Sequence, residues 1–468
     1  MKKLFSTFLI LLGLSATLRA NNIQVNNVTL SSQNVTSHFS IVNFDVSWDH
    51  SWRTSSNEAN YDGAWVFVKF RKANSNLWQH ATLNYVTGGA AAACGNTEPT
   101  GSTLQTSADS KGVWIYRNAN GTGPVNFTSA GLRWNYGSDG VLDNDSVEVR
   151  VYAVELVYCT QGAFSLGSGG AESYYFRNGN NTNPFQVTSE NALTIGSGSG
   201  NLYYTGGGGD GLGPVPANFP KGYKAFWIMK HEFSQQLYAD FLNTLDATRA
   251  ATRNMGIPGT VNNYVPTYPE RALNNFSGLD FLALLDWMAM RPMTELEFEK
   301  AARGYNMASL PNEYAWGNTT ISSTSTVYNG GTANETPQQG NAAYYLYPNY
   351  IGRPMRCGAW ARDTTVTREQ AGASYYGVLE LSGNVAEYCV TVGNTYGRAF
   401  TGLHGDGNLD NNGNHNVTNW DGSAIGVRGG SYGDAYNQLM VSDRYYANSI
   451  NNGTRSVSCG GRGVRTAE

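Results

Sequence analysis

Charged side chains are scarce in this chain of 468 residues. Asp, Glu, Lys and Arg together make up 14% of it, whereas about a quarter is usual in soluble proteins. The formal net charge is −4, and the lysines and arginines form no cluster. Since nucleic-acid binding depends on a basic surface, the sequence predicts no nucleic-acid partner.

Cysteine and histidine are also few. The six histidines form no H-x-x-x-H pair and the five cysteines no C-x-x-C pair, so the closely spaced ligands of a zinc site are missing. Five is an odd number, so at least one thiol is unpaired or pairs between chains. Buried thiols and one or two disulfides are both compatible with the sequence. The cysteines are Cys94, Cys159, Cys357, Cys389 and Cys459.

Long apolar stretches are missing except for a short one near the start. Lys2 and Lys3 precede an apolar run over residues 4–14, and small residues lead to Ala20. This order is typical of a secretory signal peptide, and the run is too short to span a bilayer. We therefore predict a signal peptide over residues 1–20 and no transmembrane span. The mature protein is expected to be secreted, periplasmic or at the cell surface.

Residues 21–153 have the pattern of an all-β sandwich domain. The segments 39–48, 64–71, 112–117 and 147–154 are rich in strand-forming residues, and loops of Gly, Asn and Ser separate them. Val147, Val149 and Val151 alternate with polar residues, so they share one face of their strand. Six of the eleven tryptophans lie in this region, and we expect them to fill its core rather than to form a sugar-binding surface.

Two amphipathic helices are predicted in the remainder, residues 154–468. Ser234 is suited to the N-cap of the first, whose apolar residues recur at helical spacing. Thr294 and Glu297 form a capping box for the second, and Gly304 is suited to its end.

Several short motifs follow one another in residues 155–466. They are G-A-F-S-L-G at 162–167, R-P-M-T-E-L-E-F-E-K-A-A-R at 291–303, A-W-G at 315–317, G-V-L-E-L-S-G-N-V-A-E-Y at 377–388, R-G-G-S-Y at 428–432 and G-V-R at 463–465.

In this order the motifs resemble those of the formylglycine-generating enzyme family, also called sulfatase-modifying factor domains. Any one motif would be weak, but the ordered set makes chance agreement improbable. The resemblance implies an α+β fold, the family's variant of the C-type-lectin-like fold, preceded here by the all-β sandwich.

The resemblance also locates the family's chemistry. Its oxidases convert a substrate cysteine to formylglycine with O₂ and a copper ion held by two enzyme thiolates. Those positions correspond to Asp434 and about Leu439, and no cysteine lies between Cys389 and Cys459. Because a carboxylate is a hard ligand and Cu(I) a soft ion, we predict no copper, no catalytic residues of this kind and no formylglycine-generating activity.

A structural calcium ion is a second property that the resemblance implies. Its ligands would be Asn384, Val385 through its carbonyl, and Glu387, which are oxygen donors of the kind that Ca²⁺ prefers. The alternative is that Asn384 caps a turn while Glu387 pairs with an arginine.

A ligand groove is predicted around the polar loop 401–420, since aromatic and arginine side chains anchor ligands well. The alternative is that these are ordinary loop and core residues. The candidate groove residues are His404, Asp406, Trp420, Tyr432, Asp434 and Arg444.

Two hypotheses about function follow. The first is an exported pseudoenzyme that acts as a binding or structural protein; it would engage a glycan, an extracellular peptide or an envelope protein, or self-associate. The second is a metal-dependent oxidase of the sulfatase-modifying factor family that uses a different site, with Asp434, His404 and Asp406 as candidates.

Overall fold

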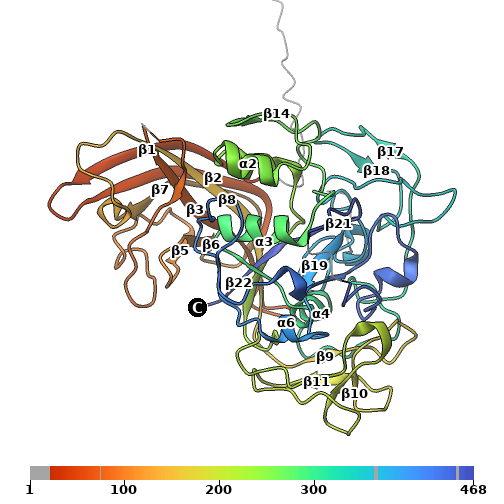
Figure 1. The fold of residues 1–468 in the computed structure, drawn as a ribbon. Helices are drawn as coiled ribbons and strands as arrows, with labels where there is room; N and C mark the ends of the chain where they lie inside the picture. Colours follow the sequence, from red (N-terminus) through yellow and green to blue (C-terminus); the bar gives the residue numbers. More distant parts are fainter. Residues whose placement is uncertain (1–21, 74, 363–366, 450–452) are drawn as a thin grey trace, which may run out of the picture.

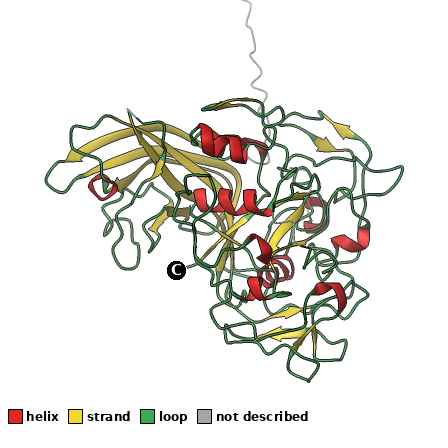
Figure 2. Ribbon diagram, viewed as in Figure 1, coloured by secondary structure: helices red, strands yellow, loops and turns green. Residues whose placement is uncertain are grey.

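The structure is a computed structural model that describes residues 22–73, 75–362, 367–449 and 453–468. The predicted signal peptide lies outside these ranges. The described residues form a mixed fold that is mostly sheet, with a few short helices and long loops (Figures 1 and 2). Among them, no helix is long and apolar enough to cross a membrane.

The N-terminal region begins with a three-stranded antiparallel sheet, red to orange in Figure 1. Along its central strand every second side chain is buried, from Val42 to Trp48. This alternation turns one face toward a core that the second sheet completes. In spatial order the strands are β1 (Gln24–Asn34), β2 (Phe39–Arg53) and β7 (Gly121–Trp134).

The second sheet has eight strands and runs through the middle of the molecule. All of its pairings are antiparallel. In spatial order it contains β16 (Arg291–Pro292), β22 (Gly463–Thr466), β13 (Phe226–Met229), β8 (Val147–Cys159), β3 (Asp62–Lys72), β6 (Val113–Arg117) and β5 (Ser102–Thr106), with β4 (Gln79–His80) paired to β3.

Strand β8 carries this sheet across the boundary that we placed between residues 153 and 154. It pairs with β3 along residues 147–157 and with β13 along residues 156–159. The two predicted domains therefore share one continuous sheet, and the boundary falls inside a strand.

Strand β3 is buried on both faces because it lies between two cores. Val66 and Val68 pack into the N-terminal core, whereas Trp65 and Phe67 pack into a larger core with the helices. Trp114 also lies in the larger core. Thus only some of the tryptophans fill the N-terminal core that the sequence predicted for them.

Both predicted helix starts are confirmed. The Ser234 hydroxyl accepts a hydrogen bond from the Leu237 N–H, and Thr294 forms its capping box with Glu297. The helices are α1 (Gln235–Leu242), α2 (Ala247–Arg253), α3 (Gly278–Trp287), α4 (Glu295–Arg303), α5 (Arg368–Ala371) and α6 (Thr395–Arg398).

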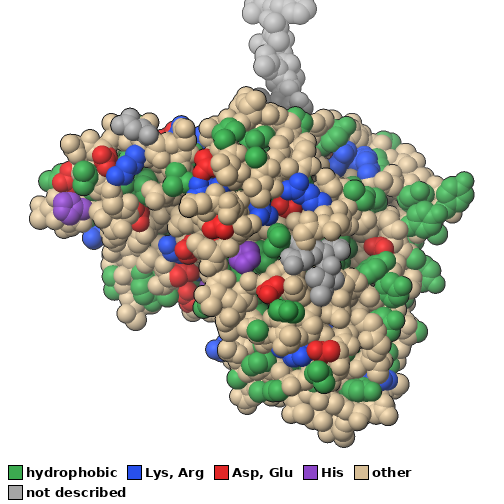
Figure 3. All heavy atoms as spheres, in the orientation of Figure 1, with side chains coloured by type: hydrophobic (Ala, Val, Ile, Leu, Met, Phe, Trp, Pro, Cys, Tyr) green, Lys and Arg blue, Asp and Glu red, His purple; other side chains and the backbone are tan. Residues whose placement is uncertain are grey.

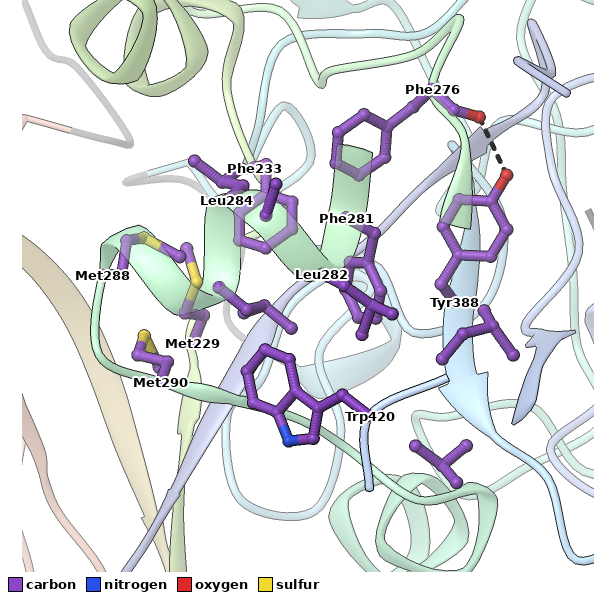
Figure 4. Packing of buried hydrophobic residues seen from close by; sticks show 14 of the residues in the cluster. Met229, Phe233, Phe276, Phe281, Leu282, Leu284, Met288, Met290, Tyr388 and Trp420 are labelled. Atoms are coloured by element: carbon purple, nitrogen blue, oxygen red, sulfur yellow. Dashed lines mark hydrogen bonds between the residues drawn. The ribbon is translucent and has the colours of Figure 1, made fainter. Parts of the chain in front are cut away.

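Helix α3 was not predicted, because it is almost entirely buried and its sequence lacks a polar face. It lies in the large core (Figure 4), where Phe281 and Leu282 pack near Tyr388 and Trp420. The Tyr388 hydroxyl donates a hydrogen bond to the Phe276 carbonyl at 2.8 Å. Trp420, which we predicted to line a groove, is part of this core.

Short strands and turns complete the C-terminal part. A three-stranded sheet has the order β20 (Ile425–Arg428), β19 (Ala386–Val390) and β21 (Cys459–Gly460). The two-stranded pairs are β9 (Phe164–Leu166) with β11 (Phe185–Val187), β10 (Arg177–Asn178) with β12 (Leu202–Tyr203), β14 (Gly259–Thr260) with β15 (Asn263–Tyr264), and β17 (Val327–Tyr328) with β18 (Thr336–Pro337).

Candidate functional site

Helix α4 carries the residues of the longest motif, and they form buried ion pairs. Glu295, Glu299 and Arg303 follow one another at intervals of four residues, so they lie on one face of the helix. Glu295 accepts hydrogen bonds from the Arg444 guanidinium at 2.8 and 2.9 Å and from Arg428 at 3.2 Å. These contacts join the helix to two distant segments of the chain.

The pairs continue along the same face. Glu299 accepts from Arg428 at 2.8 Å and from Arg303 at 3.0 Å, and Arg303 also pairs with Glu313. The set thus balances three arginines with three glutamates, and all six are buried. These motif residues hold the fold together.

Arg444 occupies the centre of this network and does not line a groove. It is fully buried, and it also donates to the carbonyls of Tyr174 at 3.0 Å and Gly208 at 2.9 Å. Its guanidinium lies over the Phe176 ring, 3.9 Å from the centroid. Arg444 therefore connects the segment around β10 and β12 to α4.

The segment 377–388 places Asn384 in a buried turn. Asn384 has a positive φ of 65°, and its amide oxygen accepts a hydrogen bond from the Met355 N–H at 2.8 Å. Its amide nitrogen donates to Glu232, whose carboxylate also accepts from the Val385 N–H at 3.0 Å. Asn384 therefore organises a turn through its own side chain.

Glu387, in strand β19, forms a buried ion pair with Arg462. The two carboxylate oxygens accept from the guanidinium at 2.8 and 2.6 Å. Arg462 is fully buried and also donates to the carbonyls of Leu379 at 2.7 Å and Met229 at 3.0 Å. The arginine partner that we considered as an alternative for Glu387 is therefore present.

This arrangement does not fit the calcium ligands expected from the resemblance. An ion on Glu387 would have to displace the Arg462 guanidinium from both oxygens, and the Asn384 oxygen already accepts the Met355 N–H. Across the described ranges, no three His, Cys, Asp or Glu side chains are grouped so that they would hold a metal ion. We therefore expect no calcium ion at Asn384, Val385 and Glu387, an expectation that thermal unfolding can test.

Removing calcium is expected to leave the melting temperature unchanged, because Arg462 already supplies the positive charge beside Glu387. The measurement is thermal unfolding in EDTA, compared with the same protein after calcium is restored at constant ionic strength. Magnesium in place of calcium serves as the control for unspecific ionic effects. A melting temperature that rises with calcium alone would contradict this expectation.

Three buried carboxylates, those of Glu232, Glu380 and Glu387, lie around the Arg462 guanidinium. Burial raises the pKa of Glu380 to about 7. Burial also raises the pKa of Glu232 well above its usual range, and the charges of Glu380 and Glu387 add to this effect. Glu380 accepts hydrogen bonds from the N–H groups of Gly358 at 2.9 Å and Ala359 at 3.1 Å. This cluster therefore binds protons more readily than free carboxyl groups do.

The two positions aligned with the family's thiolates have structural roles here. The Asp434 carboxylate accepts hydrogen bonds from the Ser431 N–H at 2.9 Å and from its hydroxyl at 2.6 Å. Leu439 is completely buried in an apolar cluster with Tyr314 and Trp316. Asp434 thus closes a turn, and Leu439 fills a small core.

The remaining groove candidates lie in other surroundings. The His404 ring nitrogen Nε2 accepts from the Thr466 N–H at 3.0 Å, and burial lowers the pKa of His404 well below its usual range. The backbone N–H of Asp406 donates to Asp286 in α3 at 2.9 Å. Tyr432 instead donates its N–H to the Asn384 carbonyl at 2.9 Å. The structure does not bring the six predicted residues together into one groove.

Exposed tyrosines around the Asp434 turn were not singled out from the sequence. The Tyr345 N–H donates to the Asp434 carbonyl at 2.8 Å. The exposed fractions are 45% for Tyr345, 75% for Tyr347 and 54% for Tyr436. The signal for Tyr345 and Tyr347 was the run A-A-Y-Y-L-Y-P-N-Y at 342–350, which holds aromatic residues without charge. Figure 3 shows one face of the molecule, on which charged side chains are sparse and hydrophobic ones gather at the edge beyond β17 and β18.

Comparison with known proteins agrees with the motifs. A search among curated proteins finds no match. A family model, described as the sulfatase-modifying factor enzyme 1-like domain, matches residues 180–467. This match covers more than half of the chain and includes α4, the segment 377–388 and the Asp434 turn. The chain therefore belongs to the family of sulfatase-modifying factor enzyme 1-like domain proteins.

Proposed function

We propose that this protein is an exported, non-catalytic binding protein. It uses a sulfatase-modifying factor domain of the C-type-lectin-like kind, preceded by a β-sandwich, to engage a glycan, an extracellular peptide or an envelope protein. The single observation that supports this most is the use of the two thiolate positions. Asp434 is committed to the Ser431 turn and Leu439 to an apolar core, so neither offers a soft ligand for copper.

The exposed tyrosines form the surface that we propose for ligand binding. Tyrosine offers a large, rigid contact area with one hydroxyl, and its binding costs little conformational entropy. Antibody binding sites contact polar ligands with loops that are rich in Tyr, Asn and Gly. Here Tyr436 and Gln438 lie two and four residues after Asp434, and Tyr347 is the most exposed of the tyrosines around this turn. An uncharged polar ligand suits this surface best.

The test combines a binding screen with paired variants. The purified protein without residues 1–20 is screened against immobilised glycans and peptides, and the double variant Tyr347→Ala, Tyr436→Ala is expected to bind the ligand at least about tenfold more weakly. Tyr396→Ala is the matched control, because Tyr396 is 51% exposed and lies on α6. Equal binding by the double variant and the control would place the binding surface elsewhere.

The same protein is expected to form no aldehyde on a peptide that carries a sulfatase motif with cysteine, in the presence of copper and oxygen. Formation of formylglycine under these conditions would overturn the non-catalytic part of the proposal. Sedimentation of the free protein separates ligand binding from self-association, since association alone would change its mass without any ligand.

A further inference from the structure

A cavity of about 440 Å³ lies beside the start of α1, and its lining includes none of the residues that we assigned to binding. It is formed where three loops meet. Its lining consists of Gln236, Tyr268, Pro269, Glu270, Arg271, Gly331, Thr332, Ala333, Glu335 and Arg356.

Two arginines face each other in this cavity. Arg271 and Arg356 are partners in an antiparallel β-bridge, so their side chains emerge on the same side. The bridge is fixed by hydrogen bonds from the Ala272 N–H to the Met355 carbonyl at 3.0 Å and from the Cys357 N–H to the Glu270 carbonyl at 2.9 Å. Like charges directly opposite each other are destabilising, unless an anion lies between them.

The Glu335 carboxylate, which lines the cavity, is paired with a third arginine, Arg353. Glu335 accepts from the Arg353 guanidinium at 3.0 and 2.7 Å, and it also accepts the N–H groups of Gly331 and Arg356. The Arg356 guanidinium itself donates to two backbone carbonyls, those of Glu335 at 2.5 Å and Cys357 at 3.2 Å. Its hydrogen bonds thus go to neutral acceptors, although the side chain is buried.

Arg271 is held in position by an aromatic ring. Its guanidinium carbon lies 3.8 Å from the centroid of the Tyr268 ring, and its Nε atom is buried without a hydrogen-bond partner among the described residues. Gly331 packs closely against the Tyr268 ring, since a Cβ atom added there would lie 2.8 Å from that ring. The guanidinium is therefore positioned before any ligand arrives.

Arg271 and Arg356 line the cavity together with two carboxylates, those of Glu270 and Glu335. The Glu335 carboxylate is already paired with Arg353, which lies outside the lining. Burial lowers the pKa values of both Arg271 and Arg356.

We propose that this cavity binds an oxyanion (a carboxylate, sulfate or phosphate group) of a small ligand, held between Arg271 and Arg356. Guanidinium groups bind such anions with two parallel hydrogen bonds. A cavity of this size accommodates a small molecule that carries the anion.

Calorimetric titration at constant ionic strength tests the proposal. The probes are inorganic sulfate, inorganic phosphate and glucuronate, with glucose as the uncharged counterpart of glucuronate. At least one of the three anions is expected to bind, whereas glucose is not. Arg271→Gln is expected to raise the Kd of that anion at least about tenfold, because the charged guanidinium and its paired hydrogen bonds are lost. Arg177→Gln is the matched control, because Arg177 also lies over a tyrosine ring, that of Tyr203 at 4.9 Å.

Each outcome decides between sources of the anion or overturns the site. Binding of sulfate or phosphate alone indicates a free inorganic anion, whereas tighter binding of glucuronate indicates an acidic sugar. Equal Kd values for the wild type and Arg271→Gln, or no response to any probe, would overturn the proposal. The Tyr347→Ala, Tyr436→Ala variant should bind the anion normally, so failure of the proposed binding function would not affect this result.

Discussion

Replacing Glu295 with glutamine is expected to lower the free energy of unfolding by about 3–5 kcal/mol. The carboxylate pairs with Arg428 and Arg444, and all three side chains are buried. Glutamine keeps the shape of the side chain but removes its negative charge. Arg444 would then lose the carboxylate that pairs with it, while Arg428 would keep its pair with Glu299. A buried ion pair that has lost one partner is costly.

The measurement is chemical unfolding of the variant and the wild type, followed by circular dichroism. Glu148→Gln is the matched control, since Glu148 pairs with Arg71 at 2.6 Å but is 44% exposed. Exposed pairs contribute at most about 1 kcal/mol, so this control is expected to unfold almost like the wild type. Similar losses in both variants would show that the network around α4 does not carry the stability that we assign to it.

The sequence was most informative where local chemistry decides the structure. The Ser234 and Thr294 caps and the strands at 39–48 and 64–71 depend on neighbouring residues, and all are present. The order of the motifs was sufficient to indicate the family, because it does not depend on knowing any contact. The role of the motif residues could not be predicted in the same way. Glu295 meets Arg444 across 149 residues of sequence, and no local pattern reveals such a pair.

Residue type misled the prediction of the groove. Arginine and tryptophan are frequent in binding sites, but they serve equally well in cores when their polar atoms find partners. Arg444 has carboxylate and carbonyl acceptors, and the Trp420 indole donates to the Leu403 carbonyl at 3.1 Å. The cavity with Arg271 and Arg356 was missed for a related reason, since these two residues meet only through a bridge between distant loops.

The shared sheet also lay beyond the reach of the sequence. In the sequence, residues 147–159 look like the last strand of one domain followed by the first strand of the next. The pattern of residues does not reveal which strands pair with them on either side. In the structure, β8 has β3 on one side and β13 on the other. The N-terminal region is therefore joined to the family domain through backbone hydrogen bonds, and we expect the two to unfold together.

The stability of the protein is expected to depend on pH through Glu380. Its pKa is raised from 4.5 to about 7 in the folded protein by burial. The folded state therefore holds a proton on this group between these values, whereas the unfolded chain releases it. Its contribution to stability is fully present below about pH 4.5 and is lost as the pH rises through 7. A shift of this size corresponds to on the order of 3 kcal/mol.

Other buried groups also make the stability depend on pH, some with the same sign as Glu380 and some with the opposite sign. Burial also raises the pKa of Asp286 to about 7, with the same sign. Burial lowers the pKa values of His80 and His404, so their contributions are lost as the pH falls below about 6.5. The pH profile of the wild type alone therefore cannot identify Glu380, and a difference between two proteins is needed.

Glu380→Gln provides that difference. The amide oxygen of glutamine can still accept a hydrogen bond from Gly358 or Ala359, but the side chain no longer titrates. Unfolding free energies measured between pH 5 and pH 8 should show the wild type losing stability relative to this variant by up to about 3 kcal/mol. Glu148→Gln, measured in the same way, should stay parallel to the wild type. If the curves of wild type and Glu380→Gln were also parallel, the carboxyl group would be ionised throughout this range, with Arg462 and Arg356 sufficient to compensate all three glutamates around them.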